Sequence, residues 1–141
     1  MFDVATNKVA IPVMSDVEIA MVRELETEAM KLPQVRIEID HVLHAGMYSR
    51  TAKIPAGVLI TGVLIKVPTT LVLSGDATMF VGAETIRLRG YHVIPSEANR
   101  KQAFVAHEDT YLTMSFPSAA QTVDEAEAEF TDEVDLLTTR R

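Results

Sequence analysis

The first regular pattern of apolar positions in the chain lies between Ser15 and Pro33. Ser15 opens the sequence SDVE, a capping box in which the serine side chain accepts from the amide of Glu18 and the Glu18 side chain reaches back. Apolar residues then recur at helical spacing, at Val17, Met21, Leu25, Ala29 and Leu32. Because Pro33 cannot continue the helical hydrogen bonds, the pattern predicts a helix that ends there and covers one face of the domain.

From residue 35 onwards the period changes to that of short strands. The segment VRIEID alternates apolar and polar residues with period two, as a half-buried strand does. Further short apolar segments follow, namely MYSRTAKIP, VLITGVLIK, TLVLSG, ATMFVG, ETIRLRG, YHVIP, QAFVAH and TYLTMSF. Turn residues separate them, among them Ser74-Gly75-Asp76, which we interpret as a hairpin turn. Strands this closely spaced leave no room for crossover helices and predict a sandwich or a barrel.

The last apolar pattern is again helical. Thr122 opens the capping-box sequence TVDE, and Val123, Ala126, Phe130, Val134 and Leu137 fall on one helical face. One interpretation is a solvated acidic helix with an apolar stripe. The other is a helix that docks on a neighbouring subunit, with Phe130, Val134 and Leu137 as the partner-contact residues.

These patterns predict one structural domain in three parts. Residues 1–34 form an N-terminal arm and helix, residues 35–117 a β-barrel, and residues 118–141 an acidic C-terminal helix.

Composition and charge limit the possible partners. The chain has no cysteine, and its longest apolar run is too short to span a bilayer. The N-terminus lacks the basic and apolar regions of a secretion signal, so we expect a cytoplasmic protein without a membrane partner. The net charge of −7 comes from the segment 122–135, which holds seven acids and no base. A neutral body with an acidic tail argues against a nucleic-acid partner.

The strand-rich part resembles the cupin family of small jelly-roll barrels, in the segments IPAG, LVLSGDATMFVG and GYHVIP. More narrowly, HAGMYSRTAKIPAG, LIKVPTTLVLSGD, GYHVIP, RKQAFVAHEDT and EAEFTDE are similar to a group of cupin-like proteins encoded by tailed bacteriophages. The resemblance implies a mainly β fold, a single cupin-like jelly-roll barrel with an N-terminal helix and an amphipathic C-terminal helix. Such barrels often bury an exposed sheet edge against a partner, so we expect a homo-oligomer, a dimer or a trimer.

The metal-binding motifs of the cupin family are not preserved in this chain. Counting from Gly57 places Val63 and Ile65 at the two histidine positions of the first motif, and Thr69 or Thr70 at its glutamate. Counting from Pro95 places Arg100 at the histidine of the second motif. Valine and isoleucine have no lone pair and arginine is a cation, so we expect neither a cupin metal nor another cofactor.

The histidines of the chain offer a different site. His41 and His44 are three residues apart in an extended segment, so they point to opposite faces and cannot share an ion. His44, His92 and His107 come from different strands, and a barrel can bring such residues together. Each also has an explanation as a turn or core histidine. With Tyr48, these three are the candidate ligand-binding residues, and no set of a nucleophile and a base indicates a catalytic centre.

Two classes of function therefore remain. The first is a non-enzymatic phage protein, virion-associated or accessory, that acts through contacts with itself and with other virion proteins. It would be found in the host cytoplasm or incorporated in the virion. The second is a small-molecule-binding protein or enzyme that uses the barrel pocket, including a protein that sequesters a host signalling molecule. The sequence favours the first, because the family's metal ligands are missing and the acidic tail suits a partner.

Overall fold

The computed structural model describes residues 2, 3 and 8–137; parts of the predicted N-terminal arm (1 and 4–7) and of the predicted C-terminal helix (138–141) lie outside the described residues. A small hairpin comes first, followed by a helix, seven strands and two short helices. Their bounds are β1 Phe2–Asp3, β2 Lys8–Val9, α1 Asp16–Ala29, β3 Glu38–His44, β4 Met47–Ile54, β5 Leu59–Thr61, β6 Thr69–Val81, β7 Glu84–Ser96, β8 Ala103–Ala106, β9 Thr110–Pro117, α2 Val123–Phe130 and the 3₁₀ helix η1 Val134–Leu136.

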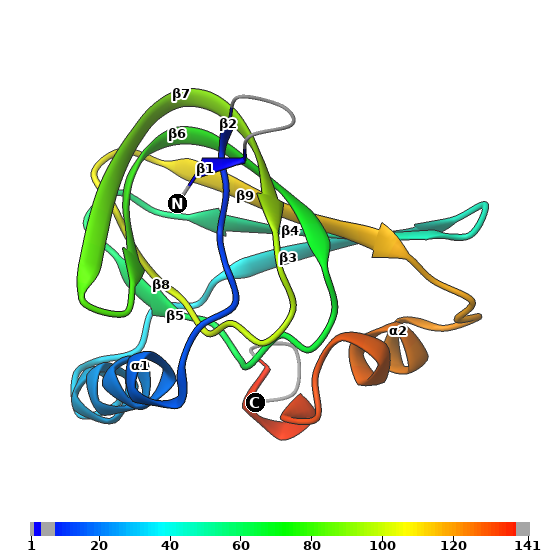
Figure 1. Cartoon of the computed structure of the whole chain (residues 1–141), viewed down its shortest axis with the longest axis horizontal. Coiled ribbons are helices and arrows are strands. Elements are labelled where there is room, and N and C mark those ends of the chain that lie inside the picture. Colours follow the sequence, from blue (N-terminus) through cyan, green and yellow to red (C-terminus); the bar gives the residue numbers. More distant parts are fainter. Residues whose placement is uncertain (1, 4–7, 138–141) are drawn as a thin grey trace.

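The seven strands β3–β9 form one antiparallel sheet that curls into a barrel (Figure 1). The strand order is β3-β4-β9-β6-β8-β5, and β7 pairs with the other edge of β6. The first half of β6 pairs with β9 and its second half pairs with β8, so this strand joins the two parts of the barrel. The prediction of a mainly β, cupin-like barrel with one N-terminal and one C-terminal helix is confirmed.

The structure corrects the interpretation of Ser74-Gly75-Asp76 as a hairpin turn. These residues lie inside the 13-residue strand β6, where Gly75 is paired with Gly90 of β7. Gly75 has a φ of +146°, and a Cβ atom at this position would lie 2.8 Å from the Cα atom of Thr110 on β9. The glycine therefore allows a bend and a close approach of two strands, and no chain reversal occurs.

Helix α1 begins as predicted but buries a different face. Both hydrogen bonds of the Ser15 capping box are present. The buried side chains of the helix are Ile19 and Val22, whereas Val17, in the predicted stripe, is 72% exposed. The predicted stripe is therefore wrong at Val17 and Met21, which are exposed, and correct at Leu25, which packs against the core. Two apolar series at helical spacing overlap in this segment, and the barrel covers Ile19 and Val22 of the other one.

The C-terminal segment is a short helix followed by an extended turn. Thr122 caps α2 as predicted, but the helix ends at Phe130, and Thr131 has an extended backbone. The Thr131 hydroxyl donates to the carbonyl of Leu64, and the Phe130 carbonyl accepts from the amide of Lys66. These bonds hold the segment against the barrel, so the described residues 118–137 do not form the single helix that the sequence predicts.

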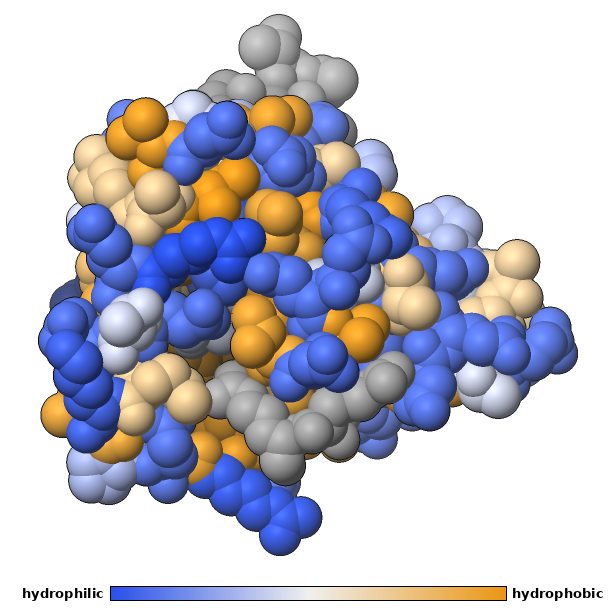
Figure 2. Space-filling view, turned by 90° about the horizontal axis from the view of Figure 1, so that it is seen from below, coloured by the Kyte–Doolittle hydropathy of each residue, from blue (hydrophilic) through white to orange (hydrophobic). Residues whose placement is uncertain are grey.

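Both helices lie at the same end of the barrel (Figure 1). Seen from below, this end presents many polar side chains with apolar ones between them (Figure 2). Among the described residues, none of the helices has the length and apolar character needed to cross a membrane.

Candidate functional site

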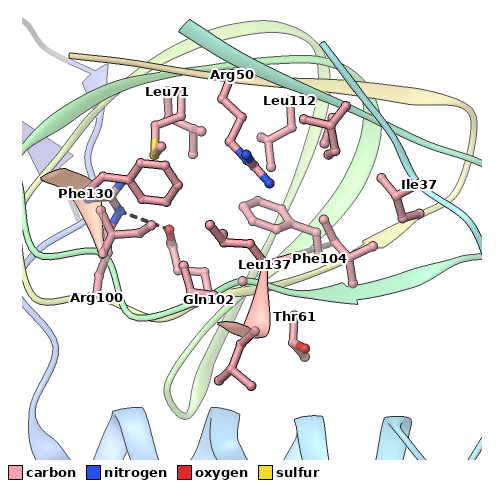
Figure 3. Close-up of a pocket in the computed structure, with 18 residues that line it drawn as sticks. Ile37, Arg50, Thr61, Leu71, Arg100, Gln102, Phe104, Leu112, Phe130 and Leu137 are labelled. Carbon is pink, nitrogen blue, oxygen red and sulfur yellow. Dashed lines mark hydrogen bonds between the residues drawn. The ribbon is translucent and has the colours of Figure 1, made fainter. Parts of the chain in front are cut away.

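The barrel contains a cavity of about 150 Å³ between its sheet and the C-terminal segment (Figure 3). Most of the wall is apolar and comes from several strands, with Ile39 from β3, Leu71 from β6, Phe104 from β8 and Leu112 from β9. Phe130, Leu136 and Leu137 of the C-terminal segment complete it. A cavity of this size, lined mostly by aliphatic and aromatic groups, can hold a benzene-sized apolar molecule.

Arg50 brings a positive charge into this apolar wall from β4. Its guanidinium group points into the cavity (Figure 3) and lies 5.7 Å from the centre of the Phe130 ring. Its Nη1 atom is 2.9 Å from Oε2 of Glu127, whose side chain is buried beneath α2. This ion pair fixes α2 on the barrel and neutralises the charge of Arg50.

Arg100 forms the opposite part of the wall and is only 1% exposed. Its guanidinium donates to the carbonyls of Val67 and Glu97, to the hydroxyl of Thr69 and to Oε1 of Gln102. Burial lowers the pKa of Arg100 to about 10, so the side chain stays charged at neutral pH. The cavity is thus apolar with a buried cation on its wall.

The cupin ligand positions fall at this cavity. Val63, Ile65 and Arg100 line it, and Arg100 donates to Thr69, which stands at one of the two possible glutamate positions. None of these side chains suits a metal ion, because two are aliphatic and the third is a cation. Among residues 2, 3 and 8–137, no three His, Asp or Glu side chains are grouped in a way that would hold a metal ion.

The three histidines proposed from the sequence are not brought together. His44 is exposed at the end of β3, next to the turn that leads into β4. The Nε2 atom of His92, on β7, is 2.7 Å from the carbonyl oxygen of Arg89, and that of His107 is 2.7 Å from the hydroxyl of Thr78. None of them lines the cavity, and the hypothesis of a convergent three-histidine site is wrong.

Tyr48 is the one predicted ligand-binding residue that lies close to the cavity wall. Its side chain is fully buried, and its ring stacks on that of Phe130. Its hydroxyl is 2.7 Å from Nδ1 of His41, whose pKa is lowered by burial and by the nearby charge of Arg50. Tyr48 supports the wall from behind, and a ligand-binding role for it stays a prediction.

The three predicted partner-contact residues face the chain's own barrel. Phe130 and Leu137 are buried and line the cavity, and Val134 packs against the core. They do so because the chain leaves the helical path after Phe130, which turns the later apolar residues towards the barrel. In this fold their side chains close the cavity, and this corrects the expectation that they face a partner.

Interactions of Glu133 anchor the segment that closes the cavity. Glu133 accepts from the amide of Leu64 and from Arg23 on α1. Burial alone would raise the pKa of Glu133, but these two hydrogen bonds and the charge of Lys101 lower it below its ordinary value of 4.5. Lys101 itself is fully buried and binds Glu26.

Sequence reasoning missed the charged residues of the cavity. Arg50 lies in a segment where apolar and polar residues alternate only weakly, so the sequence does not show which way its side chain points. Arg100 stands out in the sequence only because it replaces a metal ligand. The available signal was the sequence Arg100-Lys101-Gln102, three polar residues that lead directly into an apolar strand. Nothing in that pattern shows that all three side chains turn inwards.

Comparison with protein-family models gives no match, and no curated protein matches either. Several solved structures are similar. A protein with a double-stranded β-helix domain from Klebsiella pneumoniae has a TM-score of 0.50 at 13% identity, over 67% of this chain and 83% of that chain. Salicylate 1,2-dioxygenase from Pseudoaminobacter salicylatoxidans, described with gentisate, has a TM-score of 0.52 at 14% identity, over 79% of this chain and 33% of that chain.

A third similar structure is the Cupin_2 domain of an XRE family transcriptional regulator from Enterobacter cloacae, with a TM-score of 0.49, 12% identity, and coverage of 59% of this chain and 99% of that chain. At such identities the likeness concerns the fold alone. The fold is that of a cupin-like, double-stranded β-helix protein.

Proposed function

We propose that this protein is a metal-independent, small-molecule-binding barrel that holds an apolar ligand in the cavity between its sheet and its C-terminal segment. The observation that carries the proposal is the cavity of about 150 Å³, whose wall is formed by aliphatic and aromatic side chains. Val63 and Ile65 stand where the cupin family has metal ligands, so the pocket offers contact area in place of coordination. The free energy of binding would come from the burial of the apolar surface of the ligand against the cavity wall.

The test is a titration of the pure protein with toluene, in which the methyl NMR signals are monitored at each toluene concentration. We expect the methyl signals of Val63, Ile65 and Leu71 to shift together and to saturate. The methyl groups of Val42, an exposed residue of β3, are the control and should not move. The substitution Ala52→Leu, which adds a larger side chain to the cavity wall, should weaken toluene binding. Unchanged cavity methyl signals at saturating toluene would contradict the proposal.

A second candidate function follows from the β3–β4 hairpin, which projects away from the barrel (Figure 1). In the described part of the chain, β3 has a strand partner on one side only, and Val42 and Met47 are exposed on this hairpin. Open strand edges favour pairing with another chain. Antiparallel pairing of two β3 strands about His41 would put Glu38 opposite His44, which suits a symmetric dimer.

This second candidate is the non-enzymatic role in assembly that the resemblance to phage-encoded proteins implies. The protein would then be an accessory or virion-associated homo-oligomer in the host cytoplasm. Light scattering coupled to size-exclusion chromatography should give a dimer that Val42→Lys converts into a monomer. Peptide mass spectrometry of purified phage particles should find the chain in stoichiometric amount. If the wild-type protein is monomeric and absent from particles, the assembly role is wrong and ligand binding in the cavity is the remaining candidate function.

A further inference from the structure

The buried charges of the described residues are unevenly compensated. The buried ionised side chains are those of Asp76, Arg100, Lys101 and Glu127. Asp76 pairs with Arg87, Lys101 with Glu26, and Glu127 with Arg50. Among the described residues Arg100 makes no ion pair with a carboxylate, and the Glu97 carboxylate acts on it only through the longer-range attraction that opposes the lowering of its pKa by burial. The cavity wall therefore carries a buried positive charge with no carboxylate in direct contact.

The guanidinium of Arg100 also has a donor to spare. It has five N–H groups. Nε and both N–H groups of Nη1 are used on neutral oxygens, and Nη2 donates to Thr69. Among the described residues, the second N–H of Nη2 has no acceptor. A guanidinium that is held by four neutral acceptors is fixed in position and still attracts an anion.

Gln102 adds a neutral donor next to this charge. Its Oε1 accepts from Arg100 (Figure 3), so its Nε2 group makes no hydrogen bond to that guanidinium. Nε2 donates to the sulfur of Met79 at 3.5 Å, and a thioether is a weak acceptor, so a stronger acceptor could replace it. Arg100 and Gln102 therefore offer two N–H donors from one short segment that lines the cavity.

We propose that the natural ligand is a small monocarboxylate with an apolar body of about benzene size, whose carboxylate binds Nη2 of Arg100 and Nε2 of Gln102. This inference rests on the proposed function, since it concerns the same cavity. The apolar body contacts Leu71, Phe104 and Phe130, and the carboxylate supplies the counter-ion that Arg100 lacks. Arg50 does not compete for it, because Glu127 already neutralises that guanidinium.

The experiment compares three molecules of nearly the same shape: benzoate, benzamide and benzylamine, which are anionic, neutral and cationic at pH 7. Dissociation constants come from calorimetry or from the methyl shifts of the full chain. We expect benzoate to bind at least about tenfold more tightly than benzamide, since a hydrogen bond to a charged group is worth that much. Benzylamine should bind most weakly, because it would place a second cation beside Arg100.

Substitutions at two positions show which side chains cause the preference for benzoate. Gln102→Leu removes the amide donors and keeps the size, so it should reduce benzoate affinity several-fold and leave benzamide affinity within about twofold. Arg100→Lys retains the charge and should keep part of the preference for benzoate. Arg100→Gln should abolish it, and circular dichroism checks that this variant is folded. If Arg100→Gln does not fold, Gln102→Leu and the wild-type ligand series still decide the matter.

Each outcome bears on one proposal or on both. Equal or tighter binding of benzamide would overturn the carboxylate proposal, while binding of toluene would leave the cavity function in place. If toluene and all three ligands fail to bind, both proposals are wrong. A benzoate preference that survives in Arg100→Gln and in Gln102→Leu would place the anion elsewhere and would also overturn the inference.

Discussion

Replacement of Phe130 by alanine tests whether the C-terminal segment packs on its own barrel. The side chain is 1% exposed, and its ring contacts those of Tyr48 and Phe116 at centroid distances of 6.2 and 6.0 Å. Loss of its burial costs roughly 1.5–3 kcal/mol, and loss of aromatic contacts adds about 0.5–1.5 kcal/mol. One side of the ring faces the existing cavity, where no packing is lost, so we expect about 3 kcal/mol in total.

Urea unfolding of Phe130→Ala at several protein concentrations measures this loss. The midpoint should fall, with an unchanged slope and the same oligomeric state as the wild-type protein. Phe130→Leu is the matched control and should lose less than about 1.5 kcal/mol, because it retains most of the volume. If Phe130→Ala keeps the wild-type stability but dissociates an oligomer, the residue contacts a partner and the reasoning is refuted.

Three further predictions concern the helix, the sheet and the acid dependence of stability. Ile19→Ala should lower the free energy of unfolding by about 2 kcal/mol or more, and Val17→Ala should change it by less than about 0.5 kcal/mol; equal effects would mean that the buried face is misplaced. Gly75→Ala should be more damaging in thermal melts than Gly46→Ala, because both glycines have positive φ but a Cβ atom meets another strand only at the first. Glu133→Gln should be less stable than the wild-type protein at pH 7, and a deficit that does not shrink as the pH falls below 4.5 would contradict the lowered pKa. The sign follows because a depressed carboxyl pKa contributes stability above its ordinary value of 4.5 and loses it as the pH falls through the folded-state value.

Local signals in the sequence predict the start of each helix and the strand character of the middle. A capping box depends on residues three positions apart, so Ser15 and Glu18 identify the first turn of α1 without any tertiary information. The Thr122 cap is correct for the same reason. The alternation of VRIEID likewise needs only the period of a strand, and β3 begins within it.

Signals that depend on a distant neighbour are ambiguous in the sequence. Glycine favours turns, but it also permits close approach of two strands, and only the position of Thr110 decides between these roles for Gly75. In α1 the series that contains Val17 and the series that contains Ile19 are both spaced as a helical face. Which one is buried depends on where the barrel lies, so periodicity alone could not choose.

The candidate site shows the same limit in its charges. Reading the cupin motif by position identifies Arg100 as a residue that cannot bind a metal, and this conclusion needs no structure. The same comparison shows only that a metal ligand is missing at this position, because a sequence does not show what surrounds a charge. The structure surrounds Arg100 with neutral acceptors and turns it towards an apolar cavity, while the other buried charges of the described residues have counter-ions. A cation in that setting would suit an anionic ligand, as we propose.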